Sequence, residues 1–217
     1  YQLLKAKPGY HKVRGIEGLS SPLVGREAEF QVLQDAVTRL QQGVGGIVTL
    51  VGEAGLGKSR LVAELHHTLA TPPETGAMSS EIRWIEGRCL SYSGSIAYLL
   101  WLDILRSLLD VTPDDASSGV QEKLRKRVQA LCPEQVNDVY PFLAQLLSLP
   151  LDDAAQSRLR GIEAEGLHTL TFRAIATIIE RTAEQQPLVI VCEDLHWADP
   201  TSIDLLEHLL ALTDRVP

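Results

Sequence analysis

The chain has 217 residues and a mass of 23.8 kDa, a size that suits one domain or one domain with an appendage. Hydrophobic residues make up 45% of it, which excludes a largely disordered chain. Acidic residues outnumber basic ones, 28 to 20, for a formal net charge of −8, so binding of nucleic acid mainly through electrostatic attraction is disfavoured.

Residues 1–22 are predicted to be a linker or arm from a preceding domain, because prolines and glycines interrupt any periodic pattern there. A solvated connector is the favoured interpretation, and a specific docking arm is the alternative. We expect the first helix over Arg26–Leu40, where apolar residues recur on one face, with Gly43 capping its end. The β-branched run Ile47–Val51 then predicts a strand buried on both faces.

A glycine-rich turn follows this strand, and apolar spacing then predicts a helix over Lys58–Leu69. Further strands are predicted at Ile82–Cys89 and Leu188–Cys192. Residues 111–119 are predicted to be loop. Further helices are expected over Ala97–Leu109, Gln121–Leu131, Glu134–Leu147, Glu163–Gln185 and Thr201–Leu212. Asp199 is expected to cap the last of these helices, and Pro200 to occupy its first position.

The alternation of strands and helices favours an α/β fold with a parallel sheet and right-handed crossovers. Residues from about 110 to 160 carry helical patterns only. We therefore expect this stretch to be a helical insertion in the sheet architecture, within one domain over residues 23–217.

The sequence between the first predicted strand and the second helix satisfies the phosphate-loop pattern G-x-x-x-x-G-K-[ST]. Its residues are Gly52, Glu53, Ala54, Gly55, Leu56, Gly57, Lys58 and Ser59. The glycines let backbone N–H groups surround an anion, and the helix that follows presents its positive end to phosphate. Lys58 would reach the β- and γ-phosphates, and the Ser59 hydroxyl suits Mg²⁺. The alternative is a glycine-rich turn followed by an ordinary lysine.

The third predicted strand ends in two acids, Glu193 and Asp194. In a protein with a phosphate loop, one acid would hold the hydrated Mg²⁺ and the other would orient or deprotonate water. Neighbouring strand residues point to opposite faces, so the two acids cannot share one role. His196 is interpreted as structural, with a γ-phosphate sensor as the alternative, and Trp197 as a packing residue.

Three further patterns indicate no separate site. The three cysteines, Cys89, Cys132 and Cys192, are widely spaced, which disfavours a disulfide scaffold or a zinc site and favours a reducing compartment. Basic residues at 123 and 125–127 are interpreted as a solvated helix face. No apolar run approaches the roughly 20 residues of a membrane span, and no signal-peptide pattern is present. We therefore expect a cytoplasmic protein.

The motifs VGREAEF (Val24–Phe30), VGEAGLGKSRLVAEL (Val51–Leu65) and IVCEDLHWADPTSIDLL (Ile190–Leu206) together resemble the STAND branch of AAA-type ATPases. More narrowly, the chain resembles the ATPase module that follows a cyclase catalytic domain in large bacterial signalling proteins. The resemblance implies binding of ATP or ADP with Mg²⁺.

The resemblance also implies particular contacts. Nucleotide contacts would come from Val24, Gly25 and Arg26 near the adenine or ribose, and from the phosphate loop through Arg60. Metal contacts would come from Ser59, Glu193 and Asp194. Where many relatives carry Asp as the first acid, this chain has Glu193. We favour Glu193 for the metal and Asp194 for water.

The fold that the resemblance implies is the three-layer parallel sheet of a P-loop NTPase. In that fold a further strand, ending in a polar sensor residue, lies between the phosphate-loop strand and the acid-bearing strand. The chain stops at Arg215–Pro217, where that strand would begin. We therefore expect a piece of a longer protein, with a gap in its sheet.

The leading functional hypothesis is a nucleotide-dependent switch that acts on an output domain in the same longer chain, such as a cyclase, a kinase or a transcription regulator. A nucleotide-sensing scaffold without turnover is the main alternative, and a small-molecule kinase or a DNA-binding initiator ATPase ranks lower. The sequence leaves open whether the protein forms a nucleotide-dependent oligomer.

Overall fold

The computed structural model describes residues 24–70, 82–91 and 96–216. Two parallel strands, β1 (Arg83–Arg88) and β2 (Leu188–Glu193), form the sheet of the described chain, with Ile85 opposite Ile190. The predicted strands at 82–89 and 188–192 are therefore confirmed, and so is their parallel pairing. The predicted linker 1–22 lies outside the described residues.

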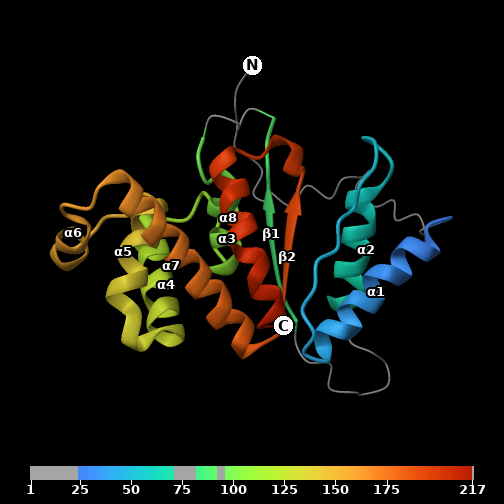
Figure 1. Cartoon of the computed structure of the whole chain (residues 1–217), viewed down its shortest axis with the longest axis horizontal. Helices are drawn as coiled ribbons and strands as arrows, with labels where there is room; N and C mark the ends of the chain where they lie inside the picture. The colour runs from blue at the N-terminus through green and yellow to red at the C-terminus, as the bar shows by residue number, and fades with distance from the viewer. Residues whose placement is uncertain (1–23, 71–81, 92–95, 217) are drawn as a thin grey trace.

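Helices cover the sheet and extend away from it on one side (Figure 1). Helix α3 (Leu99–Leu108) packs on β1, and α8 (Pro200–Leu210) packs on α3. The long helix α7 (Ala164–Gln185) leads into β2 and packs against α5 (Val136–Leu146). Helix α5 also contacts α4 (Ser117–Leu131) and α6 (Asp153–Leu159).

The close fit of α3 on β1 depends on Gly87. A Cβ at this position would lie 2.5 Å from the Cγ1 of Ile104 and 2.8 Å from the carbonyl oxygen of Leu100. Ile85 and Cys89 flank Gly87 on the same face and are buried, as the alternation of a strand requires. This face of the sheet therefore belongs to the main hydrophobic core.

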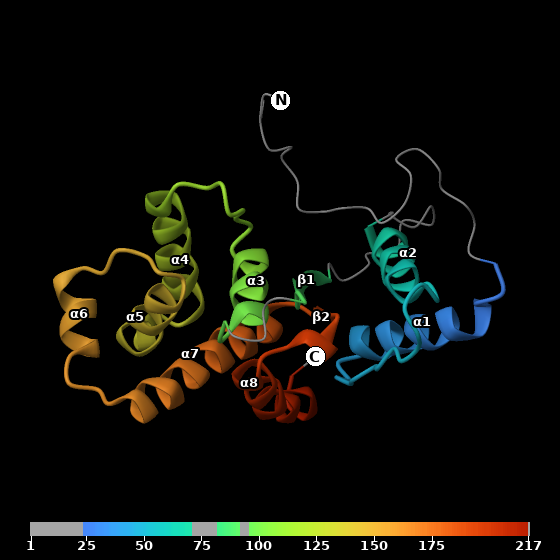
Figure 2. The ribbon, with the colours of Figure 1, turned by 90° about the horizontal axis from the view of Figure 1, so that it is seen from above.

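The core is divided into two separate clusters. The larger one joins the sheet with the six helices α3 to α8, and the smaller one is formed by Leu33, Val37, Leu61 and Leu65. These four residues come from α1 (Glu27–Gln41) and α2 (Lys58–Ala70), which pack on each other. The two views show α1 and α2 on the opposite side of the sheet from α4–α6 (Figures 1 and 2).

The predicted strand Ile47–Val51 is wrong for the described structure, because residues 44–50 form an extended segment that pairs with neither strand. The side chains of Ile47 and Val51 are 58% and 89% exposed, where burial on both faces was expected. The physical reason is that β-propensity only suits a residue to a strand, while a strand exists through a hydrogen-bonded neighbour. The predicted three-strand sheet is thus a two-strand sheet here.

Helix boundaries differ from expectation mainly between residues 110 and 160, all of which are described. This stretch contains only helices, as predicted, but α4 begins at Ser117 within the predicted loop, and α6 was not predicted. Helix α6 has seven residues, too few for a periodic pattern to identify it. The helix predicted over 134–147 starts instead with a 3₁₀ turn at Pro133–Gln135.

Candidate functional site

The glycine-rich turn has the local geometry that the phosphate-loop pattern predicts. Gly55 and Gly57 have φ angles of +84° and +83°, a region that favours glycine, and α2 begins at the next residue, Lys58. Residues 52–57 are all exposed. The first-turn N–H groups and the positive end of α2 are therefore beside an open glycine loop.

Lys58 folds back over this loop. Its ammonium group donates to the carbonyl oxygens of Gly52, at 2.7 Å, and of Glu53, at 3.0 Å. These two bonds hold the cation beside the backbone turn that precedes the helix. Lys58 thus adds a full positive charge next to the partial charge of the helix end.

The acid Glu193 ends β2 and pairs with Arg88, which ends β1 at the opposite register position. The Arg88 Nε donates to the Glu193 Oε2 at 2.7 Å, and a second guanidinium nitrogen bonds the same oxygen. The Glu193 side chain is 15% exposed. Arg88 was not singled out from the sequence. Its contact with Glu193, 105 residues later in the chain, depends on the register of the two strands, which no local pattern shows.

Strand alternation assigns the two acids to different surroundings. Glu193 shares a sheet face with Arg88 and Trp84, and Trp84 packs against the cluster of α1 and α2. Asp194 follows the strand with a φ angle of +57°, and its charge acts on Cys89, on the α3 side of the sheet. Glu193 therefore lies on the face toward the helix that carries Lys58 and Ser59.

The phosphate loop and the acids lie toward the same end of the molecule. In Figure 1 the segment before the loop runs in the same direction as β1 and β2, and the loop lies above α2 toward the end where both strands terminate. A ring contact also joins α2 to β1, since His66 stacks on Trp84 with the ring centroids 4.6 Å apart. This stacking, together with the packing of Trp84 on the small cluster, places α2 beside β1.

The donor types at the predicted metal site suit Mg²⁺. Ser59, Glu193 and Asp194 offer hydroxyl and carboxylate oxygens, the hard ligands that this ion takes, usually only one or two carboxylates together with phosphate and water. Within the described ranges, no cluster of three or more His, Cys, Asp or Glu side chains could hold a metal by itself. The residues therefore fit a metal that arrives with a phosphate ligand.

The predicted adenine contacts lie at the start of α1. Val24 is exposed, the Gly25 N–H donates to Glu27, and Arg26 forms an ion pair with Glu29 at 2.6 Å. In Figure 1 the start of α1 lies beyond α2, away from β2. The role of these residues in holding the base therefore stays a prediction.

The cysteines near the acids are unsuited to nucleophilic chemistry. Burial raises the pKa of Cys192 to about 12 and that of Cys89 to about 11, where Asp199, Asp194 and Asp103 add to the effect. Both thiols are therefore protonated at neutral pH. Trp197, predicted to pack, is instead 45% exposed beside His196, with the ring centroids 5.0 Å apart.

Comparisons with known proteins relate nearly the whole chain to one family and to one relative. A sequence profile described as "AAA ATPase domain" matches residues 22–217. The chain is 27% identical over 221 residues to an uncharacterized protein, R02095, of Rhizobium meliloti (strain 1021). That alignment covers all of this chain and 20% of the relative, so the chain spans about a fifth of the relative's length.

No solved structure gives a significant match to this chain. In the part of the chain that the structure describes, no helix is both long enough and apolar enough to cross a membrane.

Proposed function

Since the chain belongs to the family of AAA ATPase domains, we propose that it binds ATP with Mg²⁺ and serves as a nucleotide-dependent switch for an output domain in the same longer protein. The observation that carries the proposal is the loop at residues 52–57. It combines two glycines of positive φ with a helix N-terminus and with Lys58 folded over the turn. Such a loop presents backbone N–H groups and a cation to phosphate oxygens.

Two segments of the chain would hold the nucleotide and its metal ion, the phosphate loop with the start of α2 and the end of β2. The N–H groups of the loop and the Lys58 ammonium would hold the phosphates, and Ser59 with Glu193 would hold Mg²⁺. The ion, when bound, neutralises charge on the phosphate oxygens. Asp194 would orient the attacking water, on the strength of its position directly after Glu193.

The division of the core supports a switch. The phosphate loop belongs to the small cluster of α1 and α2, while Glu193 belongs to the sheet of the large cluster. A nucleotide that contacts both the phosphate loop and Glu193 would hold the two clusters in one arrangement. Loss of the γ-phosphate would remove contacts between them and let them move apart. The output domain is proposed to lie in the part of the longer protein that this chain does not span.

The test is nucleotide titration on a protein that extends beyond residue 217, with fluorescent ATP as the ligand. Lys58→Ala should abolish measurable binding, because the variant loses the positive charge that the Gly52 and Glu53 carbonyl oxygens hold beside the loop. The control is Arg39→Ala, which removes an exposed cation near the end of α1 and should leave the affinity unchanged. Equal affinities for wild type and Lys58→Ala would contradict the proposal.

A scaffold that holds nucleotide with little turnover is the second candidate, and the Arg88–Glu193 pair favours it. Glu193 already has a charged partner, with which Mg²⁺ must compete. Asp194→Asn distinguishes the candidates by ATP hydrolysis assay. A switch that hydrolyses ATP should lose turnover and keep binding, whereas a scaffold has no turnover to lose.

A further inference from the structure

Helix α4 carries four cations on neighbouring positions, and three of them have charged or polar partners. Arg125 pairs with Asp152 at 2.5 Å and lies over the ring of Tyr140. Lys126 pairs with Glu122 at 2.6 Å, and Lys123 donates to the carbonyl oxygen of Asp110 at 2.7 Å. The sequence-based interpretation of a solvated helix face therefore describes these three residues reasonably well.

Arg127, the fourth cation, differs from its neighbours. Its guanidinium is partly buried, and its Nε has no hydrogen-bond partner. Among the described residues, the one other buried side-chain polar atom without a partner is the Nε of Arg83. Burial lowers the pKa of Arg127, and the charge of Arg83 lowers it further. Two guanidinium groups thus act on each other in a partly desolvated place, an arrangement that costs free energy unless an anion compensates it.

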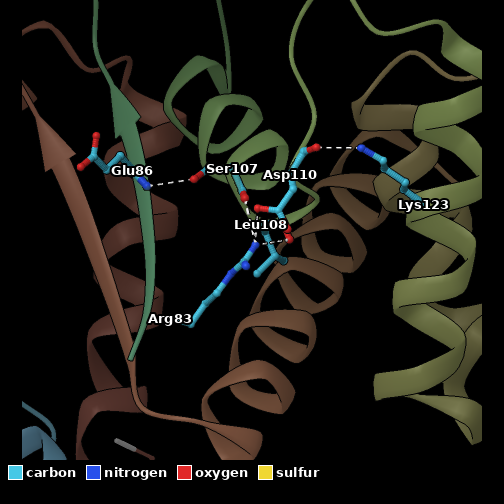
Figure 3. A network of polar contacts seen from close by, with 6 residues as sticks. All are labelled: Arg83, Glu86, Ser107, Leu108, Asp110 and Lys123. Carbon is cyan, nitrogen blue, oxygen red and sulfur yellow. Dashed lines mark hydrogen bonds and ion pairs between the residues drawn. The ribbon is translucent and has the colours of Figure 1, made fainter. Parts of the chain in front are cut away.

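Arg83 is held in place by the C-terminal end of α3. One of its terminal nitrogens donates to the carbonyl oxygen of Leu108 at 3.1 Å and to the carboxylate of Asp110 at 2.7 Å (Figure 3). Figure 3 also shows Lys123 reaching the carbonyl of Asp110 from α4. The Asp110 carboxylate, which pairs with Arg83, also acts on Arg127 and raises its pKa.

A shallow, open cavity of about 380 Å³ lies at this place, between the end of α3 and α4. Three cations, Lys123, Lys126 and Arg127, and one acid, Asp110, supply its charged side, and Leu108, Leu109 and Ala130 supply its apolar side. With Arg83, which pairs with Asp110, four cations lie near three carboxylates, those of Asp110, Asp115 and Glu122, in a chain whose net charge is −8. The local charge is thus opposite in sign to that of the whole chain.

We propose that this cavity is a second anion site, separate from the phosphate loop, which binds the phosphate group of a small phosphorylated molecule. The Arg127 guanidinium supplies several donors in a planar array that matches phosphate oxygens, and the two lysines supply mobile positive charges. The apolar side of the cavity suits the organic part of the ligand.

The test uses inorganic pyrophosphate as the probe and Lys58→Ala protein as the background, so that binding at the phosphate loop is removed. Isothermal titration at constant ionic strength should show binding in this background. Adding Arg127→Gln should weaken that binding at least tenfold. Adding Arg125→Gln, which removes the same charge two positions away on the same helix, should change it less than twofold. Circular dichroism checks that both variants are folded.

Amide NMR shifts on titration keep the proposal testable if Arg127→Gln fails to fold. Pyrophosphate should then shift the amide signals of residues 123–130 in the Lys58→Ala protein, and Lys123→Gln should weaken the effect. Three results would overturn the proposal. They are equal losses from Arg127→Gln and Arg125→Gln, binding of sulfate as tight as that of pyrophosphate, and binding of a polyglutamate peptide in preference to pyrophosphate. The last result would indicate an acidic protein partner.

Discussion

At the scale of single residues, Gly87 shows how one missing side chain sets the distance between a helix and a sheet. We expect Gly87→Ala to lower the free energy of unfolding by about 1–3 kcal/mol, the usual cost of overpacking. The new Cβ would meet the Leu100 carbonyl oxygen at 2.8 Å, and backbone atoms cannot move aside as the end of a side chain can. Urea denaturation followed by circular dichroism measures the change.

The matched control is Gly119→Ala in α4, where a Cβ meets nothing within 4 Å. Alanine is the better helix former, so this variant should gain up to about 1 kcal/mol. If both variants lower the free energy of unfolding by the same amount, the close fit of α3 on β1 does not explain the loss in Gly87→Ala.

Arg88 is the second residue whose role depends on one contact. We expect Arg88→Met to lower the Mg²⁺ concentration for half-maximal ATP binding several-fold, because Glu193 would no longer be neutralised by a guanidinium. Methionine keeps the apolar stem of the side chain. The measurement is a Mg²⁺ titration at fixed ATP, with Arg106→Met on α3 as the control. A raised Mg²⁺ requirement would indicate that Arg88 itself contacts the nucleotide.

At the scale of elements, helix α8 begins as its sequence predicts. Asp199 accepts a hydrogen bond from the Ser202 N–H at 2.9 Å, and Pro200 occupies the first helical position. The buried carboxylate also accepts from the Ser202 hydroxyl at 2.6 Å and from the Tyr98 N–H at 3.3 Å. This cap therefore joins α8 to the start of α3.

We expect Asp199→Ala to cost about 2 kcal/mol or more of unfolding free energy, because a helix cap is lost and buried donors lose their acceptor. Asp152→Ala is the comparison, since Asp152 caps α6 but is half exposed at 46%, and it should cost about 1 kcal/mol. Thermal or urea unfolding gives both values. A smaller loss for Asp199→Ala than for Asp152→Ala would show that the buried bonds add no stability.

At the scale of the whole molecule, the two hydrophobic clusters differ greatly in size. The cluster of α1 and α2 contains four buried residues, while the other extends over the sheet and six α-helices. The stability of a region follows the apolar contacts that its opening would break. The phosphate loop therefore belongs to the less stable part of the chain.

Native-state hydrogen exchange tests this difference. Amides in α1 and α2 should exchange at least about tenfold faster than those in α5 and α7, because local opening of the small cluster costs less free energy. Adding ATP and Mg²⁺ should slow exchange in α2 more than in α5. Uniform protection across the four helices would show that the chain opens as a single cooperative unit.

The sequence by itself predicted the features that depend on neighbouring residues. The positive φ of Gly43 after α1, the Asp199 cap and the start of α2 at Lys58 all follow from local preferences of a few residues. Long amphipathic helices such as α7 were predicted from the regular spacing of their apolar residues, which is also a local property of the sequence. The family profile also agrees with the AAA-type ATPase that the resemblance of three motifs implied.

Only the tertiary structure decided which segments meet. The run at 47–51 has strand composition but pairs with no strand in the part of the chain that the structure describes, and Arg88 meets Glu193 through a register that no local pattern encodes. The charge of Arg83 in β1 likewise acts on Arg127 in α4, which lies 44 residues later in the sequence. Local preference is a property of adjacent residues, whereas pairing and burial depend on the free energy of contacts between distant ones.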